Sequence, residues 1–257
     1  MPILDGKTAI ILGASGDSNM GSATAKLFAQ QGTNIILGAR RVEGIRDLAE
    51  QLGAVAVQCD ISNEADLSSI AQTAVDRFGC LDVAVNFAGT NVQESVLEMT
   101  REGLTAVSEV HFIGGALFIK NMAQAMKDGG SIITASSLTA LVPTSGTAGY
   151  ASSKKAVDHL VRVAAHELGE HNIRVNSIIP GFTRSNMTEA YFAIPTLMAA
   201  FEKEIPLGRL GVIEDIASAA LWLASDGSRS TTGQAIDCTS GQSLRRTPTG
   251  AEIMGTA

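Results

Sequence analysis

The chain has few cysteines, and they lie far apart. Its 257 residues include only Cys59, Cys80 and Cys238, and no C-x-x-C pair occurs. An odd number of scattered cysteines indicates neither a structural zinc site nor a disulfide framework. The four histidines show no metal-ligand spacing either. We therefore expect no metal ion, and a reducing compartment, the cytoplasm.

Excess positive charge and long apolar runs are also missing. The net charge is −7, whereas proteins that hold nucleic-acid backbones need a basic surface. No apolar stretch approaches the ~20 residues that a membrane-spanning helix requires. The N-terminal segment carries Asp5 and Lys7 early and lacks the extended apolar segment of a signal peptide. We expect no nucleic-acid partner, no membrane association and no signal peptide.

What the chain does have is a regular alternation of short apolar runs and helical patterns. A run such as Thr8–Leu12 is typical of a strand buried on both faces. The expected strands are Thr8–Leu12, Asn34–Leu37, Val55–Gln58, Leu81–Val85, Ser131–Thr134, Arg174–Ile178 and Ala235–Asp237. The expected helices lie near Ser22–Gln31, Val42–Gln51, Glu64–Phe78, Gly103–Met126, Tyr150–Gly169 and Glu214–Ala224.

This alternation predicts an α/β fold of the Rossmann type. Repeated strand–helix–strand units imply right-handed crossovers and a doubly wound parallel sheet, here of about seven strands with helices on both faces. Because no linker interrupts the pattern, we expect a single domain over residues 1–241. The remaining tail, 242–257, has little apolar content, and we expect it to be ordered only against a neighbouring subunit.

A glycine-rich loop follows the first expected strand directly and opens the first helix. It reads Gly13-Ala14-Ser15-Gly16-Asp17-Ser18-Asn19-Met20-Gly21. Glycines let the backbone approach a pyrophosphate, which sits at the helix N-terminus. We therefore expect a dinucleotide to bind at Gly13, Ser15, Gly16, Met20 and Gly21. Because the Asp17 carboxylate would repel phosphate, we expect it to point away.

The end of the second expected strand indicates which dinucleotide binds. Sites for NAD usually carry Asp or Glu about 20 residues beyond the glycine loop, on the ribose 2′-hydroxyl. Ala39 stands near that position here, and Arg40 and Arg41 follow it. Guanidinium groups pair well with a 2′-phosphate, so we expect NADP(H) to be preferred over NAD(H). The alternative is that the two arginines merely flank a surface loop.

Ser137, Tyr150 and Lys154 together form a possible acid/base device. Tyr150 and Lys154 are four residues apart, so on a helix they share one face. A cation about 5 Å away favours the phenolate by roughly 3 kcal/mol at an effective dielectric of ~20, or about two pKa units. We expect Lys154 to lower the pKa of Tyr150 toward the range of general acid–base catalysis, and Ser137 to hydrogen-bond the same substrate oxygen. Taken alone, the four-residue spacing is weak evidence for a catalytic pair, since Tyr and Lys are common on solvated helix faces.

With these motifs the chain resembles the short-chain dehydrogenase/reductase family, from about Gly6 to Gly241. Three further segments carry the resemblance: Cys59-Asp60-Ile61-Ser62, Asn86-Phe87-Ala88-Gly89 and Pro180-Gly181-Phe182-Thr183. The resemblance implies that the first borders the adenine, the second supports the sheet beside the cofactor, and the third packs on the nicotinamide. The cofactor residues implied in these segments are Asp60, Ile61, Asn86, Ala88, Gly89, Pro180, Gly181, Phe182 and Thr183.

The resemblance also implies a reaction. Tyr150 would transfer a proton, Lys154 would bind the nicotinamide ribose, and Ser137 would orient a carbonyl or hydroxyl group. The implied activity is an NADP(H)-dependent oxidoreductase that interconverts a ketone and a secondary alcohol. The helix from Tyr150 is apolar over more than one stripe. A homo-oligomer, dimer or tetramer, is therefore expected, with burial inside the subunit as the alternative.

Two departures from the family pattern stand out. His111 occupies the position of an Asn that helps a water molecule connect the lysine to solvent. An imidazole can bond water and titrate near neutrality, so we expect His111 to serve a modified relay or touch substrate; the alternative is simple packing. The glycine loop is also about two residues longer than the common pattern.

The segment 184–205 stands where the family has its lid over the substrate. Its apolar residues would exclude water from the reaction or pack on the domain itself: Met187, Tyr191, Phe192, Ile194, Leu197, Met198 and Phe201. They favour a moderately hydrophobic ketone or secondary alcohol as the small-molecule substrate. Arg184 leaves open the possibility that the site binds a carboxylate group of the substrate.

Two other functions stay open. The first is a cofactor-binding sensor or scaffold with little catalysis, favoured by His111 and the altered loop. The second is an enoyl-thioester reductase of the family's divergent branch. That branch fits the longer glycine loop but separates its Tyr and Lys more widely than Tyr150 and Lys154.

Overall fold

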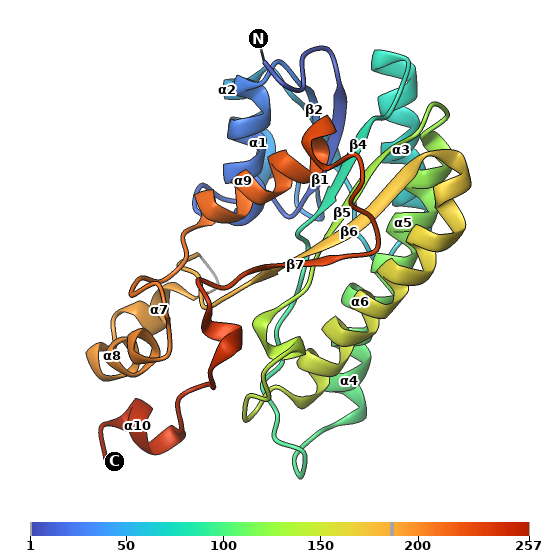
Figure 1. Cartoon of the computed structure of the whole chain (residues 1–257). Coiled ribbons are helices and arrows are strands. Elements are labelled where there is room, and N and C mark those ends of the chain that lie inside the picture. Colours follow the sequence, from blue (N-terminus) through green and yellow to red (C-terminus); the bar gives the residue numbers. More distant parts are fainter. Residues whose placement is uncertain (1, 186–187, 257) are drawn as a thin grey trace.

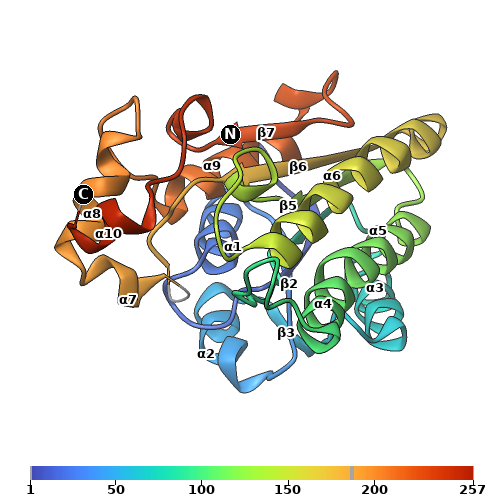
Figure 2. The same ribbon diagram turned by 90° about the horizontal axis from the view of Figure 1, so that it is seen from below.

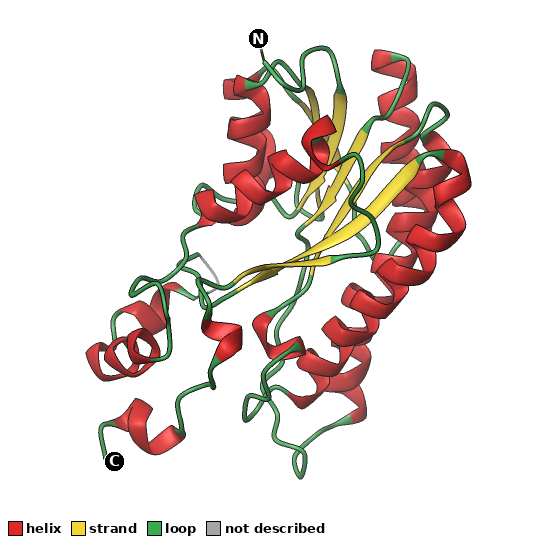
Figure 3. Cartoon of the chain, in the orientation of Figure 1, coloured by secondary structure: helices red, strands yellow, loops and turns green. Residues whose placement is uncertain are grey.

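The computed structural model describes residues 2–185 and 188–256, which form one parallel sheet covered by helices on both faces (Figures 1 and 3). The strands are β1 (Thr8–Leu12), β2 (Asn34–Ala39), β3 (Val55–Gln58), β4 (Val83–Asn86), β5 (Gly130–Ala135), β6 (Ile173–Pro180) and β7 (Ala235–Cys238). Their order is β3-β2-β1-β4-β5-β6-β7. The predicted doubly wound sheet of about seven strands is confirmed.

The order of the strands reverses between β1 and β4, and this reversal creates the crevice that matters for function. All five residues of β1 are buried, because the strand is covered on both faces. In register, Leu12 lies beside both Gly38 and Asn86. Segments that leave the carboxyl ends of β1, β2 and β4 therefore meet at one edge, where open α/β sheets bind ligands.

Helices pack on the two faces of the sheet in separate groups (Figures 1 and 2). On one face lie α1 (Met20–Gln30), α2 (Glu43–Leu52) and α9 (Ile213–Ala224). On the other lie α3 (Glu64–Phe78), α5 (Gly114–Ala125) and α6 (Ala148–Leu168). Each group buries its own apolar core, with Phe28 in the first and Phe118 in the second fully buried.

The single helix expected over Gly103–Met126 is interrupted. The chain forms α4 (Arg101–Ser108), then a π-helical turn over Glu109–Ile113, and only then α5. The wide turn brings the side chain of His111 into the interior, where it is 3 % exposed. Such a local widening of the helix is set by tertiary contacts of buried groups, and π turns of this kind often mark functional sites.

The prediction for the C-terminal tail was wrong, because the tail packs on its own chain. It carries α10 (Gly250–Met254), which lies beside α8 (Pro195–Lys203) in both views (Figures 1 and 2). Arg246 pairs with Glu204 at the end of α8 and with Glu252 in α10. Thr249 and Glu252 form a capping box at the start of α10, a signal that was readable in the sequence.

Short helical segments complete the chain. They are α7 (Glu189–Phe192) and the 3₁₀ turns Leu138–Ala140, Gly169–His171, Asp226–Ser228 and Gln242–Leu244. Within the described ranges, no helix combines the length and apolar character needed to cross a membrane.

Candidate active site

A cavity of about 740 Å3 opens at the carboxyl edge of the sheet. It runs from the glycine loop after β1 to the residues that follow β5 and β6. The sequence-predicted residues that line it are Gly13, Ser15, Met20, Arg40, Arg41, Asp60, Ile61, Ala88, Gly89, His111, Ser137, Tyr150, Lys154, Pro180, Gly181, Phe182 and Thr183. The chain therefore gathers most of the predicted site in one cavity.

Three predicted residues, Gly16, Gly21 and Asn86, are not among those that line the cavity. The backbone N–H of Gly16 donates to the carbonyl oxygen of Gly44 at 3.0 Å. A Cβ atom on Gly21 would come within 2.6 Å of the Gly13 carbonyl oxygen, so Gly21 allows α1 to approach the loop. Asn86 accepts a hydrogen bond from the backbone N–H of Ala88 at 3.0 Å. These residues shape the cavity from outside.

The lengthened glycine loop is closed by Asn19, which sequence reasoning missed. The Asn19 side chain accepts from the N–H of Ser22 at 2.8 Å and so caps α1. It also donates to the carbonyl oxygens of Ser15 at 2.7 Å and Gly16 at 2.8 Å. An Asn immediately before a helix was the available signal. Asp17 is exposed and is not among the residues that line the cavity.

Charged side chains gather at the end of the cavity near β2 and β3. Arg40 and Arg41 follow β2 and line the cavity together with Asp60. Burial alone would raise the pKa of the Asp60 carboxyl, but hydrogen bonds from Ser62 and the nearby charge of Arg40 bring it below its ordinary value. Asp60 is therefore ionised at neutral pH, and Arg40 faces a fixed negative charge.

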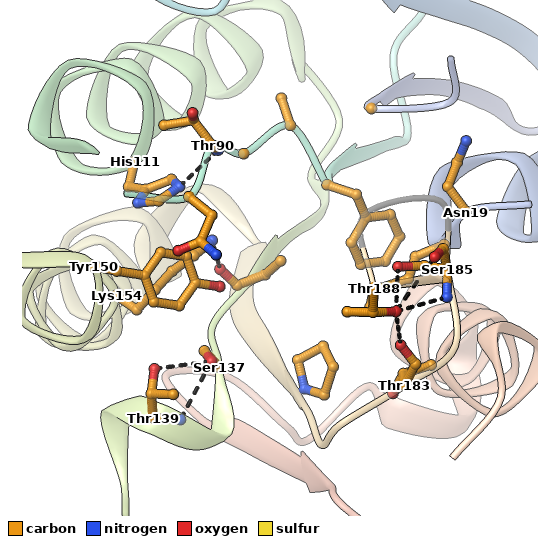
Figure 4. Close-up of a pocket in the computed structure, with 18 of the residues that line it drawn as sticks. Asn19, Thr90, His111, Ser137, Thr139, Tyr150, Lys154, Thr183, Ser185 and Thr188 are labelled. Carbon is orange, nitrogen blue, oxygen red and sulfur yellow. Dashed lines mark hydrogen bonds between the residues drawn. The ribbon is translucent and has the colours of Figure 1, made fainter. Parts of the chain in front are cut away.

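Ser137, Tyr150, Lys154 and His111 gather on one side of the cavity, opposite Thr183, Ser185 and Thr188 (Figure 4). Ser137 ends the segment after β5, and its oxygen accepts bonds from the N–H and the hydroxyl of Thr139 at 3.2 and 3.0 Å. The Ser137 hydroxyl hydrogen is therefore available for Tyr150, with which Ser137 forms a hydrogen bond. The buried Lys154 donates to the carbonyl oxygen of Ala135 at 2.9 Å.

The expected lowering of the Tyr150 pKa is wrong for this structure. Burial raises the pKa of the phenol, and the hydrogen bond with Ser137 offsets only part of that effect. The Lys154 ammonium lies 5.9 Å from the centre of the Tyr150 ring. Burial also lowers the pKa of Lys154 to about 8. Tyr150 is therefore a protonated phenol at neutral pH.

His111 is held by two hydrogen bonds that fix its tautomer. The backbone N–H of Thr90 donates to Nε2 at 3.1 Å, so Nε2 carries no proton. Nδ1 lies 2.8 Å from the hydroxyl oxygen of Ser153 and donates to it. That hydroxyl donates in turn to the carbonyl oxygen of Tyr150 at 2.7 Å.

These bonds bear on the relay expected of His111. Burial and the nearby Lys154 charge lower the pKa of the imidazole to about 3, so it is neutral at physiological pH. Both ring nitrogens are engaged by protein groups, which leaves neither for the expected water relay. His111 instead connects the loop after β4 to the first turn of α6, and its ring meets that of Tyr150 edge-on at 5.3 Å.

The far end of the cavity is built from segments distant in the sequence. Gln93 donates to the hydroxyl of Tyr191 at 3.2 Å across a separation of 98 residues. Phe182 stacks on Phe201 of the lid, with ring centres 4.4 Å apart. The lining residues missed from sequence include Thr90, Gln93, Thr139, Thr144, Thr147, Ser185, Thr188, Thr247 and Ile253. Of the predicted lid residues, Met187 lies outside the described part of the chain.

No cluster of potential metal ligands occurs in residues 2–185 and 188–256. The three cysteines are unpaired, and burial raises the pKa of Cys59 to about 12 and that of Cys238 to about 11. The chemistry available at this site therefore centres on Ser137, Tyr150 and Lys154.

Comparison with known proteins finds relatives that match most of this chain. Residues 13–243 match the family model described as Enoyl-(Acyl carrier protein) reductase. An uncharacterized oxidoreductase of Mycobacterium bovis is 36% identical over 247 residues, covering 93% of this chain and 98% of the relative. The 3-oxoacyl-[acyl-carrier-protein] reductase of Thermotoga maritima is 33% identical, with 91% and 96% covered. A solved structure of a short-chain type dehydrogenase/reductase from Mycobacterium ulcerans superposes with a TM-score of 0.92 at 28% identity, covering 98% of this chain and 94% of the other.

Proposed function

The chain belongs to the short-chain dehydrogenase/reductase family, and we propose that it is an NADP(H)-dependent oxidoreductase interconverting a ketone and a secondary alcohol. The observation that carries this proposal is the convergence of Ser137, Tyr150 and Lys154 in a cavity whose other end is a glycine loop. The fold alone would leave the chemistry open, since one fold hosts many functions.

The glycine loop fits a dinucleotide. A Cβ atom on Gly13 would lie 2.5 Å from the backbone carbon of Phe87, so only glycine leaves room between β1 and β4. The loop leads into the N-terminus of α1, a favourable site for phosphate. A nicotinamide cofactor, when bound, supplies or accepts the hydride.

The three catalytic residues divide the remaining work. Because burial keeps the Tyr150 phenol protonated, it can donate a proton to a carbonyl oxygen in the reducing direction. The Ser137 hydroxyl hydrogen, which bonds Tyr150 in this structure, can donate to the same carbonyl oxygen and hold it in place. Lys154 brings positive charge to the face of the tyrosine ring and would help to hold the cofactor ribose.

Two arginines support the preference for NADP(H). Arg40 and Arg41 line the cavity just after β2, and Ala39 stands where a carboxylate would bind a 2′-hydroxyl. Arginine forks suit the planar, bidentate recognition of phosphate.

A second substrate class is a 3-oxoacyl thioester, favoured by the named activity of the Thermotoga maritima relative. The reacting group would again be a ketone and would use the same residues. Reduction of an enoyl thioester, the activity in the family model's description, fits less well because Tyr150 and Lys154 stand only four residues apart.

The test is oxidation of NADPH with a small neutral diketone by wild type and Tyr150→Phe. Loss of the proton donor is expected to lower kcat/KM by about 1,000-fold. Tyr191→Phe is the matched hydroxyl deletion at the other tyrosine. Because it removes only the bond to Gln93, it is expected to cost no more than about tenfold.

Two other outcomes of this assay would contradict the proposal. Equal rates for wild type and Tyr150→Phe would remove Tyr150 from the mechanism. Absence of turnover with diketone and with a 3-oxoacyl thioester, while NADPH still binds, would favour the sensor or scaffold function.

The proposal extends to assembly and location. We propose a homo-oligomer, because Phe112 beside α5 and Val163 on α6 are 42% and 41% exposed apolar residues. Light scattering would give its mass. We also propose a cytoplasmic location, in keeping with three unpaired cysteines.

A further inference from the structure

The substrate end of the cavity has a different chemical character from the cofactor end. Among the described residues that line it, Lys154 and the neutral His111 are the basic groups, and acidic side chains are absent. Lys154 is already bonded to Ala135 beside the reacting centre.

Arg184 in the lid and Arg246 in the tail are both paired outside the cavity. Arg184 binds Glu189 through two nitrogens, and neither residue is among those described as lining the cavity. Arg246 binds Glu252 through two nitrogens at 2.7 and 2.6 Å and also meets Glu204 at 3.0 Å. The sequence left open that Arg184 binds a carboxylate of the substrate. In the structure, Arg184 is already paired with the carboxylate of Glu189.

The threonines of this end present oxygen lone pairs rather than hydrogens. Thr144 donates its hydroxyl hydrogen to the carbonyl oxygen of Val142, and Thr147 donates to that of Thr144 at 2.7 Å. Thr188 donates to the carbonyl oxygen of Thr183, also at 2.7 Å. A hydroxyl that has given its hydrogen away can only accept further bonds. These three hydroxyls suit apolar groups and hydroxyl donors, and they offer no hydrogen to a carboxylate, which only accepts.

The C-terminal tail forms part of this wall. Thr247 donates to the carbonyl oxygen of Pro143 at 3.1 Å, which joins the tail to the segment after β5. Thr247 and Ile253 both line the cavity. The ion pairs of Arg246 lie directly next to Thr247 and hold the tail in this position.

We propose that the substrate end, apart from Lys154 at the reacting centre, is a charge-free binding site, with the C-terminal tail as one wall, that selects an uncharged carbonyl compound over its carboxylate analogue. This inference rests on the proposed ketone/alcohol activity and narrows its substrate class. A carboxylate placed there loses its water and meets only neutral donors such as Gln93 and Tyr191, besides the Lys154 amine that is already bonded to Ala135. That exchange is costly for a buried charge.

The test compares a matched pair, ethyl acetoacetate and acetoacetate, as substrates with NADPH. We expect kcat/KM for the ester to exceed that for the acid by about 100-fold or more. Thr247→Lys places a cation in the tail wall and is expected to narrow this ratio by about tenfold, through a faster reaction of the acid. Ile253→Lys is a second variant with the same expected direction.

The control is Thr256→Lys, which adds the same charge to the tail at an exposed residue that does not line the cavity. It is expected to leave the ratio unchanged. Binding of ethyl 3-hydroxybutyrate and 3-hydroxybutyrate to the NADPH-loaded protein is measured by calorimetry in parallel. Because the reduced cofactor cannot oxidise an alcohol, the preference for the ester over the acid is measured without turnover.

The two proposals fail in different ways. If the acid reacts as fast as the ester, or its alcohol binds as tightly, the charge-free site is wrong while the reductase stands. If neither ketone is reduced but the ester alcohol still binds better than the acid, the site stands and the reductase is wrong. If Thr247→Lys and Thr256→Lys change the ester-to-acid ratio of kcat/KM equally, the tail is not a wall of the substrate end.

Discussion

The two ends of the cavity are built in different ways. The cofactor end lies on loops that leave β1, β2 and β3, and it carries Arg40, Arg41 and Asp60. The substrate end is assembled from the segment after β5, the lid and the tail, and its threonines are uncharged acceptors. Parallel strands fix the first end in place, whereas side-chain contacts between distant segments fix the second. The difference suggests that cofactor and substrate recognition can be altered separately.

The largest effect is expected from breaking the cofactor end at Gly13. Gly13→Ala adds a Cβ atom 2.5 Å from the backbone of Phe87, at a φ of +84°. Displacement of the loop by ~1 Å is expected to weaken NADPH binding by about 100-fold. Gly53→Ala is the matched control, since Gly53 has a φ of +64° but nothing within 4 Å of its Cβ position. It should cost about 1 kcal/mol of stability and leave NADPH binding within twofold, as measured by calorimetry. Equal weakening by both would mean that the close contact at Gly13 is unimportant.

An intermediate effect is expected at His111, beside Tyr150 in the substrate end. The folded pKa is about 3 and the ordinary value is 6.5. Between these values the unfolded chain binds a proton that the folded chain does not, so stability is lost as pH falls from about 6.5 toward 3. His111→Asn removes this linkage. As the pH falls from about 6 to 4, the unfolding free energy of the variant is expected to decrease less steeply than that of wild type. The two slopes should differ by about 1.4 kcal/mol per pH unit.

Denaturant titrations at several pH values measure this difference. The pH profile of kcat/KM between pH 6 and 8 should keep its shape in His111→Asn, because the imidazole is neutral there. A lost inflection near pH 6.5 would restore the relay role that the two hydrogen bonds of His111 argue against.

The smallest effect is expected from the tail contacts. Arg246→Gln removes the ion pairs that the exposed Arg246 side chain makes with Glu204 and Glu252, so the KM for a neutral ketone should rise only about threefold with kcat unchanged. The difference from wild type should shrink at 0.5 M salt, since salt screens exposed pairs. Arg209→Gln breaks the exposed pair with Asp215, which does not line the cavity, and serves as control. If the KM for the ketone rises equally in Arg246→Gln and Arg209→Gln, the tail does not form a wall of the substrate end.

The sequence predicted the strands and the glycine loop at the cofactor end for a physical reason. Strands buried on both faces must be apolar runs, and a backbone that approaches phosphate must be glycine, so both leave a local pattern such as Thr8–Leu12 and Gly13. The substrate end leaves no such pattern. The bond between Gln93 and Tyr191 joins residues far apart in the chain, and the π turn at His111 depends on Thr90 and Ser153. The rise in the pKa of Tyr150 likewise follows from burial rather than from its spacing to Lys154.

The most direct test of the separation between the two ends is a steady-state measurement on the double variant Arg40→Ala, Arg41→Ala. With a neutral ketone as substrate, kcat/KM for NADPH is expected to fall about 100-fold, because charge-assisted contacts to the 2′-phosphate are lost. The value for NADH should stay within about threefold and the ketone KM within about twofold, since no charge at the substrate end has changed. A parallel loss with NADH, or a large shift in the ketone KM, would contradict the division of the cavity into a charged cofactor end and a neutral substrate end.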